Sequence, residues 1–63
     1  MAGYIFALTT QSDEVKYIFY EIAIALIKAR EYHLILVRHR VDDDGSVKTM
    51  KIFDPYDQYG HAQ

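Results

Sequence analysis

Hydrophobic residues recur at helical spacing between residues 13 and 31, the longest periodic stretch of the chain. Spacings of three and four positions gather such residues on one face of a helix, where they can pack against a core. The stripe consists of Val15, Ile18, Phe19, Ile22, Ala25, Leu26 and Ala29. Ser12 precedes it as an N-cap residue, and neither Gly nor Pro interrupts residues 15–29. The pattern predicts one long amphipathic helix over residues 13–31.

The opposite face of this predicted helix carries a second apolar seam, made of Tyr17, Tyr20, Ile24 and Ile27. A contiguous apolar patch on a surface usually marks an association site. We therefore interpret these four residues as contacts for a second copy or another protein. The alternative is that the C-terminal tail or the stems of nearby lysines shield the seam.

Strand-like segments flank the predicted helix. Residues 4–9 are rich in residues that favour strands, and the apolar run within residues 33–41 suits a strand covered on both faces. Asp44-Gly45 signals a hairpin, residues 47–53 form the return strand, and residues 54–63 are a tail. The expected fold is a single α/β (α+β) domain over residues 1–63. It has βαββ order, a three-stranded mixed sheet and one long helix on one sheet face.

Strand register follows from the hairpin loop. A loop of two or four residues places the same hydrophobic set on one face, namely Ile35, Val37, Val41, Met50 and Ile52. A loop of three residues would mix Lys with Val on each face and is therefore disfavoured. We expect the face with Ile35, Val37, Met50 and Ile52 to meet the helix.

The short chain limits the stability of a monomer. At 63 residues it can bury only about 60 % of its unfolded surface, and small domains then need disulfides, metal or oligomerisation. The sequence contains no Cys, and 51 % of its residues are hydrophobic. These features favour a homodimer. No run is long enough to span a membrane and no cationic segment precedes Tyr4, so we expect a cytoplasmic protein without a signal peptide.

Catalytic and metal-binding patterns are weak in this sequence. His33 and His39 are about 20 Å apart along one predicted strand, too far to share an ion, and His61 belongs to the tail. The acidic run before Gly45 lacks the glutamate that a calcium loop requires, because Lys51 stands there. Ser12 and Ser46 are assigned to a cap and a turn. We therefore expect no enzyme, no metal and no cofactor.

Two functions remain. The favoured one is a non-enzymatic interaction or regulatory module, such as an inhibitor, adaptor or accessory subunit. It would bind itself and an unidentified protein through Tyr17, Tyr20, Ile24 and Ile27, with Tyr56 and Tyr59 as secondary contacts. The alternative is a nucleic-acid-binding module that uses a cationic sheet face with Arg38, Arg40 and Lys51 near Phe53. The net charge of −2 makes the alternative less favoured.

Overall fold

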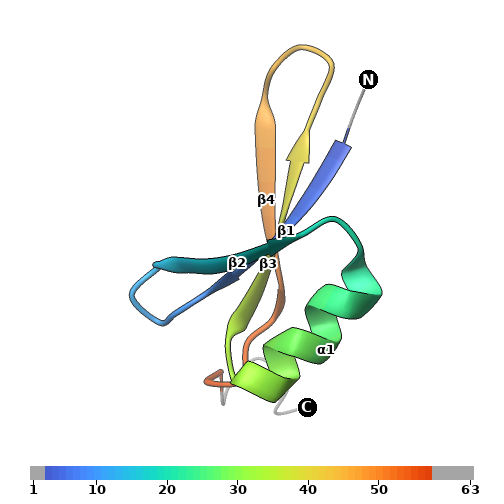
Figure 1. The fold of residues 1–63 in the computed structure, drawn as a ribbon. Coiled ribbons are helices and arrows are strands. Elements are labelled where there is room, and N and C mark those ends of the chain that lie inside the picture. Colours follow the sequence, from blue (N-terminus) through green and yellow to red (C-terminus); the bar gives the residue numbers. More distant parts are fainter. Residues whose placement is uncertain (1–2, 58–63) are drawn as a thin grey trace, which may run out of the picture.

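One helix packs on an antiparallel sheet of four strands in the computed structural model, which describes residues 3–57 (Figure 1). The elements in chain order are β1 (Gly3–Thr9), β2 (Val15–Phe19), α1 (Ile22–Tyr32), β3 (Ile35–Val41) and β4 (Val47–Phe53). The strands lie in the order β2-β1-β3-β4, and all neighbours are antiparallel. The α+β class is confirmed, whereas the three-stranded mixed sheet is wrong.

The first half of the predicted helix is strand β2. Val15, Tyr17, Ile18 and Phe19 are β-branched or aromatic residues, which fit a pleated surface and lose rotamer freedom in a helix. They pair with β1 instead, so that Phe19 lies opposite Phe6. The hydrophobic residues of this stretch have helical spacing, but their residue types favour a strand. The local sequence is therefore compatible with a helix and with a strand.

The β1–β2 turn uses the residues that the sequence assigned to a helix start. The backbone N–H of Thr10 donates to the carbonyl of Glu14 at 2.9 Å, and Asp13 adopts a left-handed φ of 68°. The hydroxyl groups of Thr10 and Ser12 lie 3.0 Å apart within hydrogen-bond distance. Ser12 is therefore a turn residue and not an N-cap, and α1 begins after Glu21.

Helix α1 ends at a left-handed residue. His33 has φ 62° and ψ 45°, a conformation that commonly terminates helices because it turns the chain away from the axis. The backbone N–H groups of His33 and Leu34 both donate to the carbonyl of Ala29. The chain therefore leaves the helix in a defined direction and enters β3 two residues later.

The helix does not connect the two strands that the sequence suggested. β1 and β3 are adjacent and antiparallel, so the expected parallel pair of these strands is wrong. β2 and β3 both run antiparallel to β1 and are therefore parallel to each other. A strand–helix–strand unit does exist, but it is β2-α1-β3, and β1 lies between its two strands.

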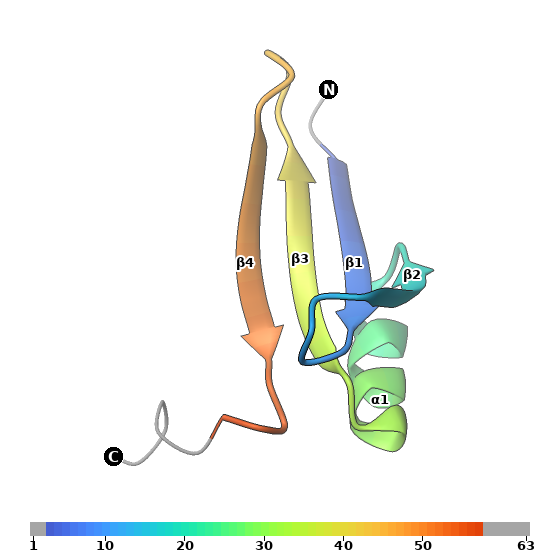
Figure 2. The same cartoon turned by 90° about the vertical axis from the view of Figure 1, so that its left-hand side faces the viewer.

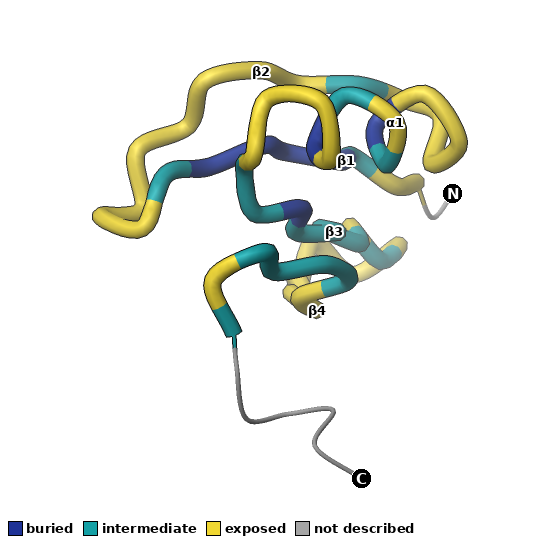
Figure 3. Tube along the Cα trace, turned by 90° about the horizontal axis from the view of Figure 1, so that it is seen from below, coloured by how far each residue is buried: buried dark blue, intermediate teal, exposed yellow. Residues whose placement is uncertain are grey.

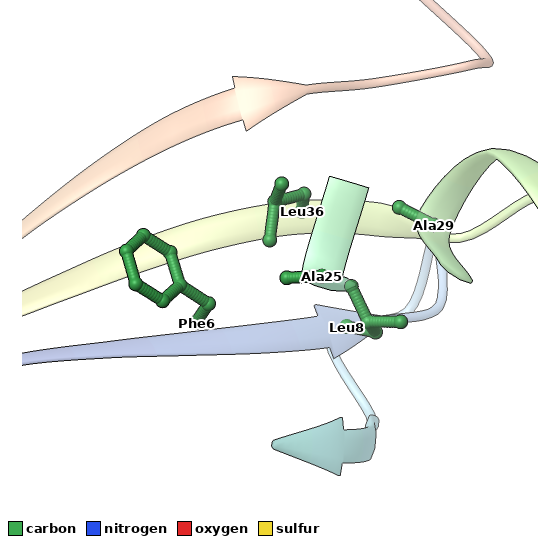
Figure 4. Close-up of a cluster of buried hydrophobic side chains, with 5 residues drawn as sticks. All are labelled: Phe6, Leu8, Ala25, Ala29 and Leu36. Atoms are coloured by element: carbon green, nitrogen blue, oxygen red, sulfur yellow. The ribbon is translucent and has the colours of Figure 1, made fainter. Parts of the chain in front are cut away.

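The core lies between α1 and the middle of the sheet. Phe6, Leu8 and Leu36 point from the sheet toward Ala25 and Ala29 of the helix (Figure 4). Burial along the chain is concentrated in β1, with shorter buried segments in α1 and β3 (Figure 3). Val15 and Ile18 were expected in this core but are exposed, because they belong to β2 and pair with residues on the opposite sheet face.

The β3–β4 hairpin has the loop length that the sequence analysis disfavoured. Asp42 and Ser46 pair through a 2.9 Å backbone bond, and Gly45 donates to the carbonyl of Asp42 at 3.0 Å. Gly45 has φ 88°. The loop is thus the three residues 43–45, a turn followed by a left-handed glycine. The loop end of this hairpin extends past the N-terminal end of α1, so burial against the helix does not constrain the register there (Figure 2).

The three-residue loop shifts β4 by one residue relative to the expected register, so the hydrophobic residues expected to share one face lie on different faces of the sheet. Val37 lies opposite Lys51, and Arg38 lies opposite Met50, so the expected face of Ile35, Val37, Met50 and Ile52 does not exist as a unit. Ile35 and Val37 face away from the helix. A bulge beside Leu36 then adds one residue to β4, which lets Ile52 and Phe53 both pack against the core.

The left-handed glycine of this loop generates a stability prediction. No atom lies within 4 Å of a Cβ built on Gly45, so Gly45→Ala causes no steric clash with other residues. It should lower the free energy of unfolding by about 1 kcal/mol, because alanine disfavours the left-handed backbone conformation. Gly45→Asn should cost less because Asn tolerates this conformation. Gly3→Ala is the control, since Gly3 lies in an extended strand with open space around it. Urea unfolding measures all three, and an equal effect of Gly45→Ala and Gly3→Ala would contradict the loop geometry.

Candidate functional site

Cross-strand partners project from the same side of a sheet, so the register assigns each residue to a face. One face meets α1 and carries Phe6, Leu8 and Leu36. The opposite face, named here the far sheet face, is covered by no helix of residues 3–57. Its apolar residues are Ile5, Ala7, Val15, Ile18, Ile35, Val37, Val41 and Val47, and its polar residues are Thr9, His39, Thr49 and Lys51.

The far sheet face is mostly apolar and only partly buried. Ile18 and Val47 lie on the two edge strands of the sheet and expose more than half of their surface, at 54 % and 58 %. Between them, Val37 is half-buried and Ala7 is buried by its strand neighbours. His39 and Thr49 satisfy each other through a 3.1 Å contact between Nδ1 and Oγ1. The apolar surface is thus continuous over Ile18, Ala7 and Val37 on β2, β1 and β3, and β4 adds Val47 at its loop end, beyond the polar His39–Thr49 row.

A shallow hollow of about 360 Å³ lies at one end of this face. Its lining residues are Thr9, Gln11, Asp13, Ile35, Val37, Lys51, Asp54 and Tyr56. The charged groups of Lys51 and Asp54 bind each other at 2.8 Å. Their charges compensate each other, so the carboxylate of Asp13 is the remaining charge of a lining that also includes the apolar side chains of Ile35 and Val37.

The ion pair in the hollow shifts both ionisation equilibria. The ammonium of Lys51 donates to Asp54 and lowers the pKa of that carboxyl group, and the backbone N–H of Tyr56 adds a second donor at 2.9 Å. The same contact raises the pKa of Lys51. Both groups are therefore more firmly charged than usual at neutral pH, and neither is suited to exchange protons with a substrate there.

The basic residues that were predicted to share a face are divided between two faces. Arg38 and Arg40 pair with Phe6 and Tyr4 on the helix side of the sheet, whereas Lys51 pairs with Val37 on the far sheet face. The predicted set of Arg38, Arg40 and Lys51 is therefore wrong as a single surface. Lys48 takes the place of Lys51, because it lies opposite Arg40.

The predicted contact residues are also dispersed. Tyr17 belongs to β2, where its ring stacks on Tyr32 of the helix with centroids 5.3 Å apart. Tyr20 lies in the connection to α1 and is strongly exposed. Ile24 and Ile27 are exposed on α1 and are named here the outer helix surface. The four residues do not form one helical seam, because the helix starts at Ile22.

Tyr56 fastens the chain after β4 to the end of the helix. Its hydroxyl donates to the carbonyl of His33 at 2.8 Å, and its ring meets the imidazole edge-on at 4.9 Å. Tyr59, its predicted companion, lies outside the described residues, as does His61. Within residues 3–57 no three His, Cys, Asp or Glu side chains are grouped as ligands for a metal ion.

Comparisons with protein-family models, curated proteins and solved structures found no match to this chain. In residues 3–57, the helix is too short and too polar to cross a membrane. Sequence reasoning missed Tyr4 and Lys48 as surface partners of Arg40. The signal that could have found Lys48 is the Asp44-Gly45 pair interpreted as the end of a three-residue loop, since that loop sets the parity of β4 against β3. Tyr4 depends on the β1–β3 register, which no local signal in the sequence gives.

The Lys51–Asp54 pair allows a test of the hollow by titration. Because the folded-state pKa of Asp54 is lowered, its contribution to stability is present above the unfolded pKa of about 3.9 and is lost as the pH falls through the folded value. Lys51→Gln should raise the pKa of Asp54 toward its usual range, as followed by carboxyl carbon chemical shifts. Lys48→Gln, on the same strand, is the control. An unchanged Asp54 titration in Lys51→Gln would show that the pair does not form.

Proposed function

We propose that this protein is a non-enzymatic protein–protein interaction or regulatory module that acts as a homodimer. The observation that carries the proposal is the mostly apolar far sheet face, which is left uncovered by the one helix of the described residues. Two copies would pack these faces together as two sheets, about 10 Å apart, in a symmetric contact.

A small monomer core supports self-association. Only three large side chains, Phe6, Leu8 and Leu36, are buried among the described residues, and the helix adds only Ala25 and Ala29. Many large hydrophobic residues stay exposed instead, including Ile18, Ile27 and Val47. Burial of apolar area stabilises a protein by about 25 cal/mol per Å². A second copy would supply burial that a chain of this length does not obtain alone.

Both open edges of the sheet disfavour association by strand addition. β2 carries a bulge beside Thr9, and β4 carries one beside Leu36. Lysines also stand on both edge strands, as Lys16 on β2 and Lys48 on β4. Bulges and lysines are the features that keep sheet edges from pairing with other chains. Association is thereby directed to the faces of the sheet.

Charge on the far sheet face is compatible with a self-complementary contact. Its one lysine, Lys51, is paired with Asp54, so two copies would not bring unpaired like charges together. The outer helix surface with Ile24 and Ile27 would remain accessible in such a dimer. We propose that surface, together with Tyr20, as the contact for a second, unidentified protein.

Self-association can be measured by light scattering after size exclusion across a concentration series. We expect a dimer that Ile18→Lys combined with Val47→Lys converts to a monomer, because both side chains are exposed in the protomer and would place charge in the contact. Ile27→Lys is the matched control, since Ile27 is 62 % exposed on the helix and should leave the dimer intact.

Circular dichroism of each variant verifies that the fold is retained. Two results would contradict the proposal. One is a monomeric parent protein at every concentration. The other is a dimer that Ile27→Lys disrupts while the double variant on the sheet does not, since self-association would then use the helix.

A further inference from the structure

A second surface, on the helix side of the sheet, combines cations with an exposed aromatic ring. It lies where β1, β3 and β4 extend beyond the N-terminal end of α1 (Figures 1 and 2). We name it the basic–aromatic surface and define it by Tyr4, Arg38, Arg40 and Lys48. Tyr4, Arg40 and Lys48 form one row across three neighbouring strands.

The guanidinium of Arg38 is held by an aromatic ring. It lies over the ring of Tyr4, 5.0 Å from the centroid, and no acid of the described residues forms an ion pair with it. Its Nε is buried without a hydrogen-bond partner among those residues. The positive charge of Arg38 is therefore not compensated locally.

Arg40 and Lys48 share a single acid. Nε of Arg40 lies 2.8 Å from Oδ1 of Asp42, at an angle that does not make a hydrogen bond, and Nζ of Lys48 lies 3.7 Å from Oδ2. The four side chains Arg38, Arg40, Lys48 and Asp42 together carry two more positive than negative charges, on a chain whose net charge is −2. The positive charge is concentrated on one end of one face.

Tyr4 gives the surface a second recognition element. It exposes 45 % of its surface, and its ring stacks on the buried Phe6, with centroids 6.5 Å apart and planes inclined by 20°. The ring is thus held in place at the edge of a cationic sheet surface. Exposed rings beside arginine and lysine on an open sheet are the combination that stacks bases and neutralises phosphates.

We propose that the basic–aromatic surface binds single-stranded nucleic acid. A base displaces the guanidinium of Arg38 from the ring of Tyr4 and stacks there, and Arg38, Arg40 and Lys48 contact phosphates. The strand crosses the sheet from β1 toward β4, because the acidic residues at the tip of the β3–β4 loop repel a path along the strands. Asp44 of that loop is held by the backbone N–H of Ser46 at 2.9 Å. This binding uses the face opposite the proposed dimer contact and does not depend on it.

Fluorescence anisotropy with a labelled single strand of about 12 nucleotides tests the proposal at low and increasing salt. Three phosphate contacts predict that the logarithm of the association constant falls against the logarithm of salt with a slope of about −2. Lys48→Gln should weaken binding and reduce that slope by about 0.7. Lys16→Gln removes the same charge from the other edge strand and should change neither quantity.

The aromatic contribution is tested separately at Tyr4. Tyr4→Ala should weaken binding about tenfold at every salt concentration, because stacking does not depend on counterion release. Tyr4→Phe keeps the ring and should retain the affinity. A duplex of the same length should bind more weakly than the single strand, since its bases are not available for stacking.

The proposal fails if the single strand does not bind at low salt, or if Lys16→Gln weakens binding as much as Lys48→Gln. Equal affinities for duplex and single strand, or no effect of Tyr4→Ala, would reduce the contact to charge alone and also overturn it. A monomer in light scattering would overturn the homodimer without changing the binding curve. The two proposals therefore fail by distinguishable results.

Discussion

The packing of two helix alanines against leucines of the sheet determines where the rest of the molecule can be. Ala25 and Ala29 are fully buried against Leu8 and Leu36. Because alanine has a small side chain, the helix backbone can lie close to the sheet, and its contact area stays small. An 11-residue helix then covers only part of one face. Because the single helix of the described residues is short and lies on one side of the sheet, the far sheet face and the end of the β3–β4 hairpin stay exposed.

The boundary between strand and helix shows what a single sequence can and cannot determine. Residues 15–20 satisfy helical spacing and, apart from Lys16, consist only of β-branched and aromatic residues, which favour strands. Local pattern alone therefore fits both structures. The decision comes from a distant partner, because β1 needs a neighbour on its outer edge and β2 supplies it. The core positions Ala25 and Ala29, by contrast, follow from spacing within the part that is helical.

The hairpin at Asp44-Gly45 illustrates a second limit. The turn itself can be predicted from these two residues. The predicted loop length rests on a further assumption, that the hydrophobic residues of both strands share one face. That inference requires a buried face, and neither face of this hairpin is buried by the helix along most of its length. The left-handed glycine sets the parity instead. The three-residue loop places Lys51 and Arg38 on different faces of the sheet. The sequence therefore predicts Arg38 and Arg40 on the basic surface but not Lys48.

The strand order also has a consequence for the order of events in folding. The β1–β2 and β3–β4 pairs are local hairpins with short turns. The β1–β3 ladder joins residues between 26 (Thr9 to Ile35) and 38 (Gly3 to Val41) positions apart. Closing long loops costs chain entropy before any contact compensates for it. Nearly all of that cost falls on one ladder. The sheet thus consists of two local hairpins, and the β1–β3 ladder, beside the helix that links them, is the contact that joins them into one unit.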